Sequence, residues 1–156
     1  MSRNNSKYPR LFVVAEHAPN APGGGGALMR QMLKGYPSER IHWWSVERIN
    51  SSPNDFQVAG EDTCLIPRYM RPHNRFTRLK SWLLENVWSR YAAHHLANSI
   101  KRVAPDIIWL NLFGWVIPTA HRLDWSHQTP IHASLWDYPD TADRNRILGL
   151  QRTRRM

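Results

Sequence analysis

The chain has 156 residues, enough for one domain with a hydrophobic core, and its 42% apolar and 21% charged residues exclude a disordered chain. A net charge of +9 favours anionic partners, which leaves nucleic acid, phosphorylated small molecules and acidic membrane surfaces open. The single cysteine excludes an intramolecular disulfide framework, and no apolar run approaches the ~18 residues of a membrane span.

The N-terminus predicts a flexible segment and a cytoplasmic protein. Residues 1–10, "MSRNNSKYPR", are basic but lead into no signal-type apolar region with a cleavage site. Lone Cys64 also fits a reducing compartment. We expect residues 1–8 to be flexible and the folded domain to begin at residue 9.

The first half of the chain reads as strand, helix, strand. Residues 11–15 form a short Val-rich apolar run, typical of a strand buried on both faces. Apolar side chains recur at a spacing of four over residues 27–34, which predicts a helix that ends at Gly35. Residues 41–46 predict a second strand, and a polar loop over 50–62 follows it.

A weak third strand is predicted at residues 63–67, "TCLIP". Residues 77–103 contain no Pro or Gly and read as one long helix, with its apolar side chains largely on one stripe and Pro105 after its end. Residues 106–111, "DIIWLN", predict another buried strand.

The rest of the chain predicts a turn, a short helix and a last strand. Gly114 marks the turn, and Pro118 is tolerable in the first turn of the helix. Residues 130–136, "PIHASLW", predict the last strand, and "DYPD" after it predicts a turn.

Strands that alternate with helices predict an α/β fold: a Rossmann-like open parallel sheet with right-handed crossovers and flanking helices. The Gly-rich segment 23–26 then follows the first strand, at the sheet edge where open α/β proteins bind ligands. Glycines let a ligand approach the backbone, and the next helix offers free N–H groups to an anion. Because the spacing matches neither a Walker loop nor a dinucleotide fingerprint, a plain flexible connection stays open.

Three segments resemble the N-terminal domain of family-4 glycosyltransferases of the GT-B fold. "RLFVVAEHAPNAPGGGGALMRQMLKGYP" is similar to the opening strand, Gly-rich turn and helix of that family. "APDIIWLNLFGW" resembles its fourth strand, and "PIHASLWDYPD" resembles the next strand, which ends at a turn in the substrate cleft. The resemblance covers about residues 9 to 143.

The resemblance implies one half of a GT-B architecture. Such enzymes hold the acceptor mainly in the N-terminal domain and the nucleotide-sugar mainly in the C-terminal one, and they transfer the sugar with retention, generally without a metal. Residues 9–143 would be the acceptor-side domain, and residues 144–156 a basic tail or the start of a truncated helix. Whether the chain is a truncation, a subunit completed by a separate donor-binding chain or a standalone remnant is open, and we expect no turnover by the chain alone.

The resemblance also implies site residues. Asp137 matches the acidic half of the cleft turn and is the expected catalytic residue, while Trp136 stands where the family usually has His. Gly24, Gly25 and Gly26 match the turn that approaches the donor phosphate and the acceptor.

Other substrate contacts are expected from the residues themselves. Glu16 and His17 end the first strand beside the loop and could hydrogen-bond a sugar, or equally be an ordinary loop charge and a surface histidine. Trp115 and Trp136 follow strand ends, where an indole ring can stack on a sugar face, although simple packing is as good an account.

The expected partners are a sugar or glycolipid acceptor, a nucleotide-sugar as co-substrate with no bound cofactor, and the surface of a membrane for peripheral association. No metal is expected, because the eight histidines lack a recognisable ligand spacing. The remaining tryptophans inside predicted elements are expected to be core or packing residues: Trp43, Trp82, Trp88 and Trp109.

An alternative function of another class stays open. Residues 68–80, "RYMRPHNRFTRLK", place Tyr69 and Phe76 among basic side chains. Cationic and aromatic groups together suit single-stranded nucleic acid, so the alternative is a basic, non-enzymatic binding module for nucleic acid or another polyanion.

Overall fold

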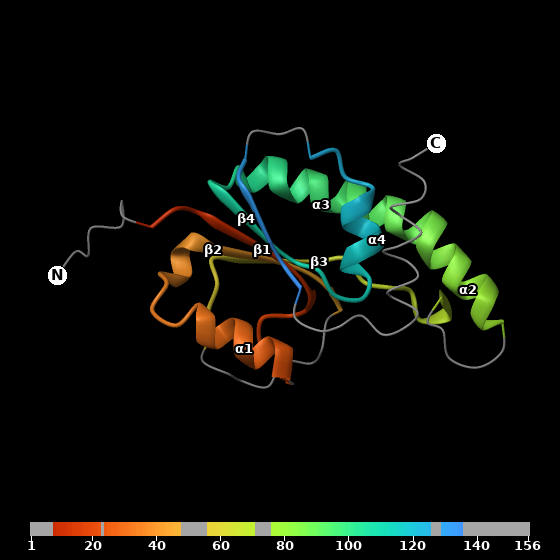
Figure 1. Cartoon of the computed structure of the whole chain (residues 1–156), viewed down its shortest axis with the longest axis horizontal. Coiled ribbons are helices and arrows are strands. Elements are labelled where there is room, and N and C mark those ends of the chain that lie inside the picture. The colour runs from red at the N-terminus through yellow and green to blue at the C-terminus, as the bar shows by residue number, and fades with distance from the viewer. Residues whose placement is uncertain (1–7, 23, 48–55, 71–75, 126–128, 136–156) are drawn as a thin grey trace.

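A parallel β-sheet forms the centre of the molecule (Figure 1). The computed structural model describes residues 8–22, 24–47, 56–70, 76–125 and 129–135. Its five strands lie in the order β3-β2-β1-β4-β5, and every neighbouring pair is parallel. The strands are β1 (Leu11–His17), β2 (Ile41–Glu47), β3 (Gly60–Thr63), β4 (Ile107–Asn111) and β5 (Ile131–Ser134). The predicted Rossmann-like α/β fold is confirmed.

Helices cover both faces of the sheet (Figure 1). Helix α1 (Gly24–Met32) lies on one face, and the opposite face carries α3 (Ser89–Val103) and α4 (Val116–His121). Helix α2 (Thr77–Leu83) runs into α3 through a π-helical segment, Leu84–Trp88, so the helix predicted over 77–103 is continuous. It ends at Ala104, whose φ of 47° is left-handed, directly before Pro105.

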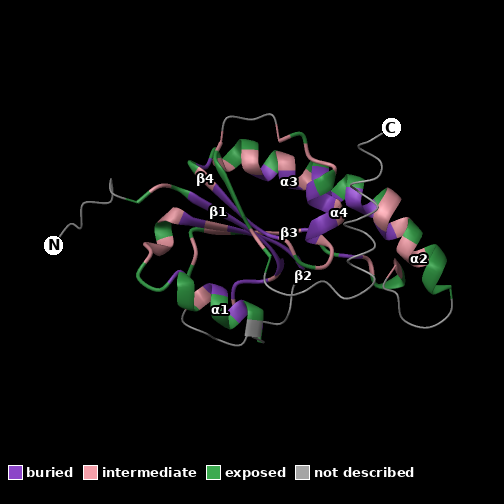
Figure 2. Ribbon diagram, in the orientation of Figure 1, coloured by how far each residue is buried: buried purple, intermediate pink, exposed green. Residues whose placement is uncertain are grey.

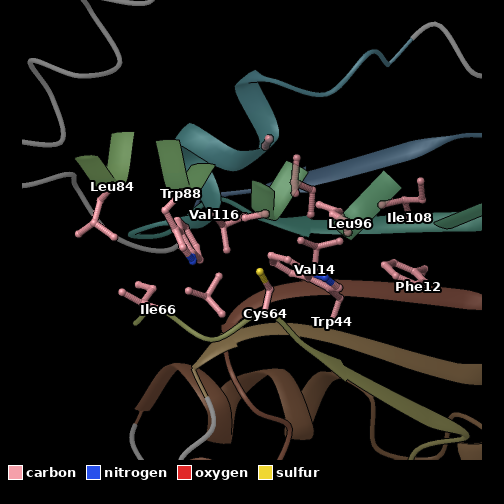
Figure 3. Packing of buried hydrophobic residues seen from close by; sticks show 14 residues of the cluster. Phe12, Val14, Trp44, Cys64, Ile66, Leu84, Trp88, Leu96, Ile108 and Val116 are labelled. Atoms are coloured by element: carbon pink, nitrogen blue, oxygen red, sulfur yellow. The ribbon is translucent and has the colours of Figure 1, made fainter. Parts of the chain in front are cut away.

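The larger core cluster lies between the sheet and α3–α4 (Figure 3). Phe12, Val14 and Trp44 project from β1 and β2 toward Leu96 of α3 and Val116 of α4, and all five are fully buried. Each such side chain contributes roughly 1.5–3 kcal/mol through burial. The opposite faces of the same strands pack against α1 in a second cluster. Alternate residues of β1 therefore enter different cores, which explains its continuous apolar sequence.

Two predictions about this region were wrong. The third strand is Gly60–Thr63, so it lies mostly in the segment predicted as a loop, and residues 64–67, predicted as strand, follow it without strand structure. Trp82 is 56% exposed, whereas Trp43, Trp88 and Trp109 are buried as predicted. The prediction that Trp82 packs in the core was wrong, because Leu84 and Trp88 are the residues of this helix that face the core (Figure 3).

Strands β1 and β4 are mostly buried, whereas β5 and much of α2 are exposed (Figure 2). The predicted flexible N-terminus, the "DYPD" turn and the basic tail fall outside the described residues. In the part of the chain that the structure describes, no helix combines the length and apolarity needed to cross a membrane.

Candidate functional site

The strand order of the sheet reverses between β1 and β4. After β1 the chain adds β2 and β3 on one side, and after β4 it adds β5 on the other side. In open α/β sheets ligands bind at the carboxyl ends of the strands on either side of such a switch. Here those ends are His17 on β1 and Asn111 on β4, two residues 94 positions apart in the sequence. We call this place the switch-point crevice.

The glycines predicted to approach a ligand begin helix α1 at this edge. Gly24, Gly25 and Gly26 are its first three residues, and the first N–H groups of a helix have no partner within it. Gly25 is exposed, with open space where a Cβ would stand, whereas a Cβ on Gly26 would lie 3.0 Å from the Ala21 carbonyl oxygen. Arg30 Nη1 donates to the carbonyl oxygens of Pro19 and Ala21, at 2.9 and 3.0 Å. The loop before α1 is therefore held in place by the helix that follows it.

Glu16 joins β1 to the loop after β4. Its side chain is buried, with the residue 9% exposed, and Oε2 accepts a hydrogen bond from the backbone N–H of Trp115 at 2.6 Å. The loop makes room for it at Gly114, where a Cβ would lie 1.9 Å from Glu16 Oε2. Burying a carboxylate costs free energy unless hydrogen-bond donors face it, so the bond to Trp115 N–H is needed. This bond holds the end of β1 and the loop after β4 in a fixed position relative to each other.

His17 lies in the same crevice, beside an aromatic residue that the sequence did not single out. The carbonyl oxygen of His17 accepts a hydrogen bond from Trp43 Nε1 at 3.0 Å. Its imidazole ring stands 6.2 Å from the ring of Phe113, with the planes tilted by 49°. Phe113 is 40% exposed, so it offers an accessible ring at this rim.

Two buried amide oxygens lie near this edge. Asn111 is 8% exposed; its Nδ2 donates to Met29 Sδ at 3.2 Å, and its Oδ1 has no hydrogen-bond partner among the described residues. Asn20 Nδ2 donates to the Phe56 carbonyl oxygen at 3.2 Å, and its Oδ1 is likewise unpartnered in the described structure. An acceptor that is buried without a donor costs about 1–3 kcal/mol, so each of these oxygens favours a further hydrogen bond from a hydroxyl or amide donor.

Sequence reasoning missed Asn111, although one signal was present. It is a polar residue that ends an otherwise apolar strand at the switch. That position alone marks it as a site candidate, because a polar side chain at a buried strand end needs a partner.

Trp115 contributes to the crevice through its backbone. Its indole ring packs against the larger core cluster and lies edge-on to Trp88, with ring centroids 6.4 Å apart. The ring is therefore occupied by packing, while the N–H of the same residue reaches Glu16.

Trp136 and Asp137 lie outside the described residues. The strand before them ends at Ser134, on the edge where β1 and β4 also end, because all three strands are parallel. Ser134 Oγ accepts a hydrogen bond from Trp109 Nε1 at 2.8 Å. The structure thus places Glu16, His17 and Asn111 at one edge of the sheet, from which the chain leads into α1, and leaves the role of Asp137 a prediction.

Within the described ranges, no three His, Cys, Asp or Glu side chains are grouped closely enough to hold a metal ion. The chemistry that the crevice can offer is hydrogen bonding by a carboxylate, an imidazole and amide oxygens, next to a helix N-terminus that favours an anion.

We compared the chain with family models, characterised proteins and solved structures, and none of them matched it. The class of the molecule is therefore defined by its own geometry: a Rossmann-like α/β domain with a polar crevice at the switch point.

Proposed function

We propose that this chain is the acceptor-side domain of a retaining glycosyltransferase that takes its sugar from a nucleotide-sugar. The observation that carries the proposal is the switch-point crevice: Glu16, His17 and Asn111 lie at the carboxyl ends of β1 and β4, and the glycine-opened helix α1 follows β1. Hydroxyl-rich ligands need acceptors such as carboxylate and amide oxygens. A sugar face also suits an exposed ring such as Phe113.

The proposed roles follow from the chemistry of each group. Glu16, His17 and Asn111 form hydrogen bonds with hydroxyl groups of the acceptor substrate. The N–H groups of Gly24–Gly26 face the diphosphate that departs from the donor. Asp137 is the proposed acid of the cleft, with Trp136 beside it. A donor-binding lobe, in the same protein or in a separate chain, would close over the crevice.

The acceptor is proposed to be at a membrane surface, because the long helix formed by α2, the π-helical segment and α3 presents an apolar stripe to solvent. The stripe consists of Leu79, Trp82, Val87 and Tyr91, which are 49–63% exposed. Exposed Arg78 lies next to them. Aromatic and apolar side chains beside basic ones are the composition of helices that lie in the interface of anionic membranes.

Sugar binding tests the main proposal. Saturation-transfer NMR with methyl glycosides should give saturable binding, and Glu16→Gln should weaken it at least fivefold through the lost charge. Glu61→Gln, on the exposed side of β3, is the matched control and should bind like the unmodified chain. Equal loss in both variants, or no transfer with any glycoside or nucleotide-sugar, would contradict the proposal.

A second candidate, a polyanion-binding module, is favoured by one observation. Tyr69 and Phe76 are 71% and 73% exposed, and Arg68 and Arg78 next to them are exposed too. Fluorescence anisotropy with a labelled single-stranded oligonucleotide separates the two functions. Tight binding that falls steeply between about 50 and 200 mM salt, and that Tyr69→Ala weakens, would support nucleic acid over the sugar acceptor.

A further inference from the structure

A second candidate site lies between α3 and the end of α4, and none of its residues belongs to the switch-point crevice. The groove is a hollow of about 530 Å³, a volume in the range of small-molecule sites. Helix α3 lines it with Arg90, Ala93, His94 and Ala97, and the chain at the end of α4 lines it with residues 121–124. Ala93 and Ala97 leave space between the helices because their side chains are small.

The groove gathers basic side chains. Arg90 and His94 come from successive turns of α3, and His121 and Arg122 face them from α4 and its C-cap; Asp124 is the acid in this lining. Arg90, His94 and His121 are exposed, and their side chains form no hydrogen bond or ion pair with any described residue. Basic groups left unpaired in a hollow favour an anion.

Arg122 is already held in position. Its Nε donates to Ser89 Oγ at 2.6 Å, and its Nη2 donates to the carbonyl oxygen of Glu85 at 2.6 Å. Nη1 is not used by either bond. A guanidinium fixed on two sides loses little conformational freedom when it binds a ligand, and its planar donors match phosphate oxygens.

A smaller apolar hollow of about 210 Å³ adjoins the basic groove. The two share Ala97, Leu123 and Asp124 as a wall. Beyond that wall the smaller hollow is lined mostly by apolar side chains: Ile100, Ile108, Trp125 and Ile131. A ligand that spans both places therefore carries negative charge at one end and an apolar group at the other.

We propose that this groove binds an organic phosphate, with the phosphate at Arg90, His94 and Arg122 and an apolar group in the hollow beside Trp125. The proposal is independent of the sugar-transfer function, because it uses different residues on a different part of the fold. The argument rests on the basic lining, the prepositioned Arg122 and the adjoining apolar hollow.

The test uses 1-naphthyl phosphate as the probe, with inorganic phosphate and 1-naphthol as its two halves. Calorimetry should show saturable binding of 1-naphthyl phosphate, at least tenfold tighter than either half. In NMR the indole N–H signal of Trp125, which donates to the Ala120 carbonyl oxygen at 2.7 Å, should shift on binding. Failure of the probe to bind at up to about 5 mM, or binding without a Trp125 shift, would overturn the proposal.

Substitutions in the groove test whether its basic side chains bind the phosphate of the probe. Arg90→Gln and His94→Gln change exposed side chains, so both should fold, and each should weaken binding at least fivefold. Lys34→Gln removes the same charge from an exposed residue after α1, outside the groove, and should leave the affinity unchanged. Arg122→Lys keeps the positive charge but not the planar guanidinium donors, so an intermediate loss is expected. Equal effects of Lys34→Gln and Arg90→Gln would show nonspecific attraction and refute the site.

Discussion

Gly114 shows how one residue sets the geometry of the crevice. Its φ is 49°, a left-handed conformation that side chains disfavour, and the carboxylate of Glu16 fills the space next to its Cα. The buried Glu16 can reach the Trp115 N–H because of this space. Gly114 is thus required by both its backbone angle and its neighbour.

We expect Gly114→Ala to lower the free energy of unfolding by about 1–3 kcal/mol, since it combines a strained φ with a clash against Glu16. Urea denaturation at pH 7 measures the change. Gly25→Ala is the control: it lies in a helix with open space around it, so stability should stay equal or rise by up to about 1 kcal/mol. Unchanged stability of Gly114→Ala would mean that the Glu16 contact is not formed.

The sequence predicted that Glu16, His17 and Trp115 belong to the site, but it did not predict the contacts that they make. Glu16 and His17 could be placed at a strand end because an apolar run stops there. The Glu16–Trp115 hydrogen bond joins residues 99 positions apart, and a backbone donor carries no signature in the sequence. Trp115 was expected to use its ring; which side of an aromatic residue faces a site depends on packing that only the structure shows.

Among the elements, β3 is the strand that the sequence placed wrongly, at residues 63–67. Its residues, "GEDT", are polar, while Cys64, Leu65 and Ile66 after it are 2%, 52% and 4% exposed. That alternation resembles a strand, yet it comes from the segment that follows β3 and inserts two side chains into the core. The apolar pattern reports burial, whereas strand pairing here is set by backbone contacts with β2.

Asp62 helps to hold β3 at the edge of the sheet. Its Oδ2 lies 3.0 Å from His42 Nε2 of β2 and also accepts a hydrogen bond from Arg102 of α3. Burial acts to raise the pKa of Asp62, but the hydrogen bonds from His42, Ser99 and Arg102 outweigh it and hold the pKa below its usual range.

We expect Asp62→Asn to lower the free energy of unfolding at pH 7 by on the order of 1 kcal/mol. Because the folded-state pKa is depressed, this stabilisation is present above the unfolded pKa near 4 and is lost as the pH falls through the folded value. Urea denaturation of both proteins from pH 7 to pH 2.5 should show the difference shrinking. Glu61→Gln, next to it and exposed, should change little, and a difference independent of pH would contradict the assignment.

The exposed stripe of Leu79, Trp82, Val87 and Tyr91 gives a prediction about membranes. Trp82→Ser should reduce cosedimentation with vesicles that contain phosphatidylglycerol several-fold, because it removes an exposed aromatic side chain that would enter the interface. Met32→Ser is the control, since Met32 is as exposed (58%) but lies on α1 across the sheet. Equal losses in both variants, or no binding of the unmodified chain, would remove the stripe as a membrane contact.

Across the whole molecule, the fold class was predictable because strands and helices alternate and the apolar runs are short. What could not be predicted is how the two cores share the sheet: Val14 and Trp44 face α3, while Val13 and Trp43, their neighbours, face α1. Continuous apolar strands hide this alternation, because both faces are buried.

One sheet with two cores should unfold as a unit. Leu96→Ala in the larger cluster and Met29→Ala in the smaller one should each lower the free energy of unfolding by about 2–5 kcal/mol. Tryptophan fluorescence and far-UV circular dichroism should report the same urea midpoint in each variant. Met32→Ala should shift it little. Separate midpoints for the two probes would mean that the α1 side opens independently.

The π-helical segment Leu84–Trp88 has a consequence for how α2 is oriented. A π turn holds one residue more than an α turn, so deleting one residue there would restore ordinary winding. The first half of the long helix would then rotate by about 100° relative to the second half. Such a deletion, made at a residue other than Val87, would turn Leu79 and Trp82 away from Val87 and Tyr91. The extra residue of the π turn therefore aligns the two halves of the exposed stripe along one side of the long helix.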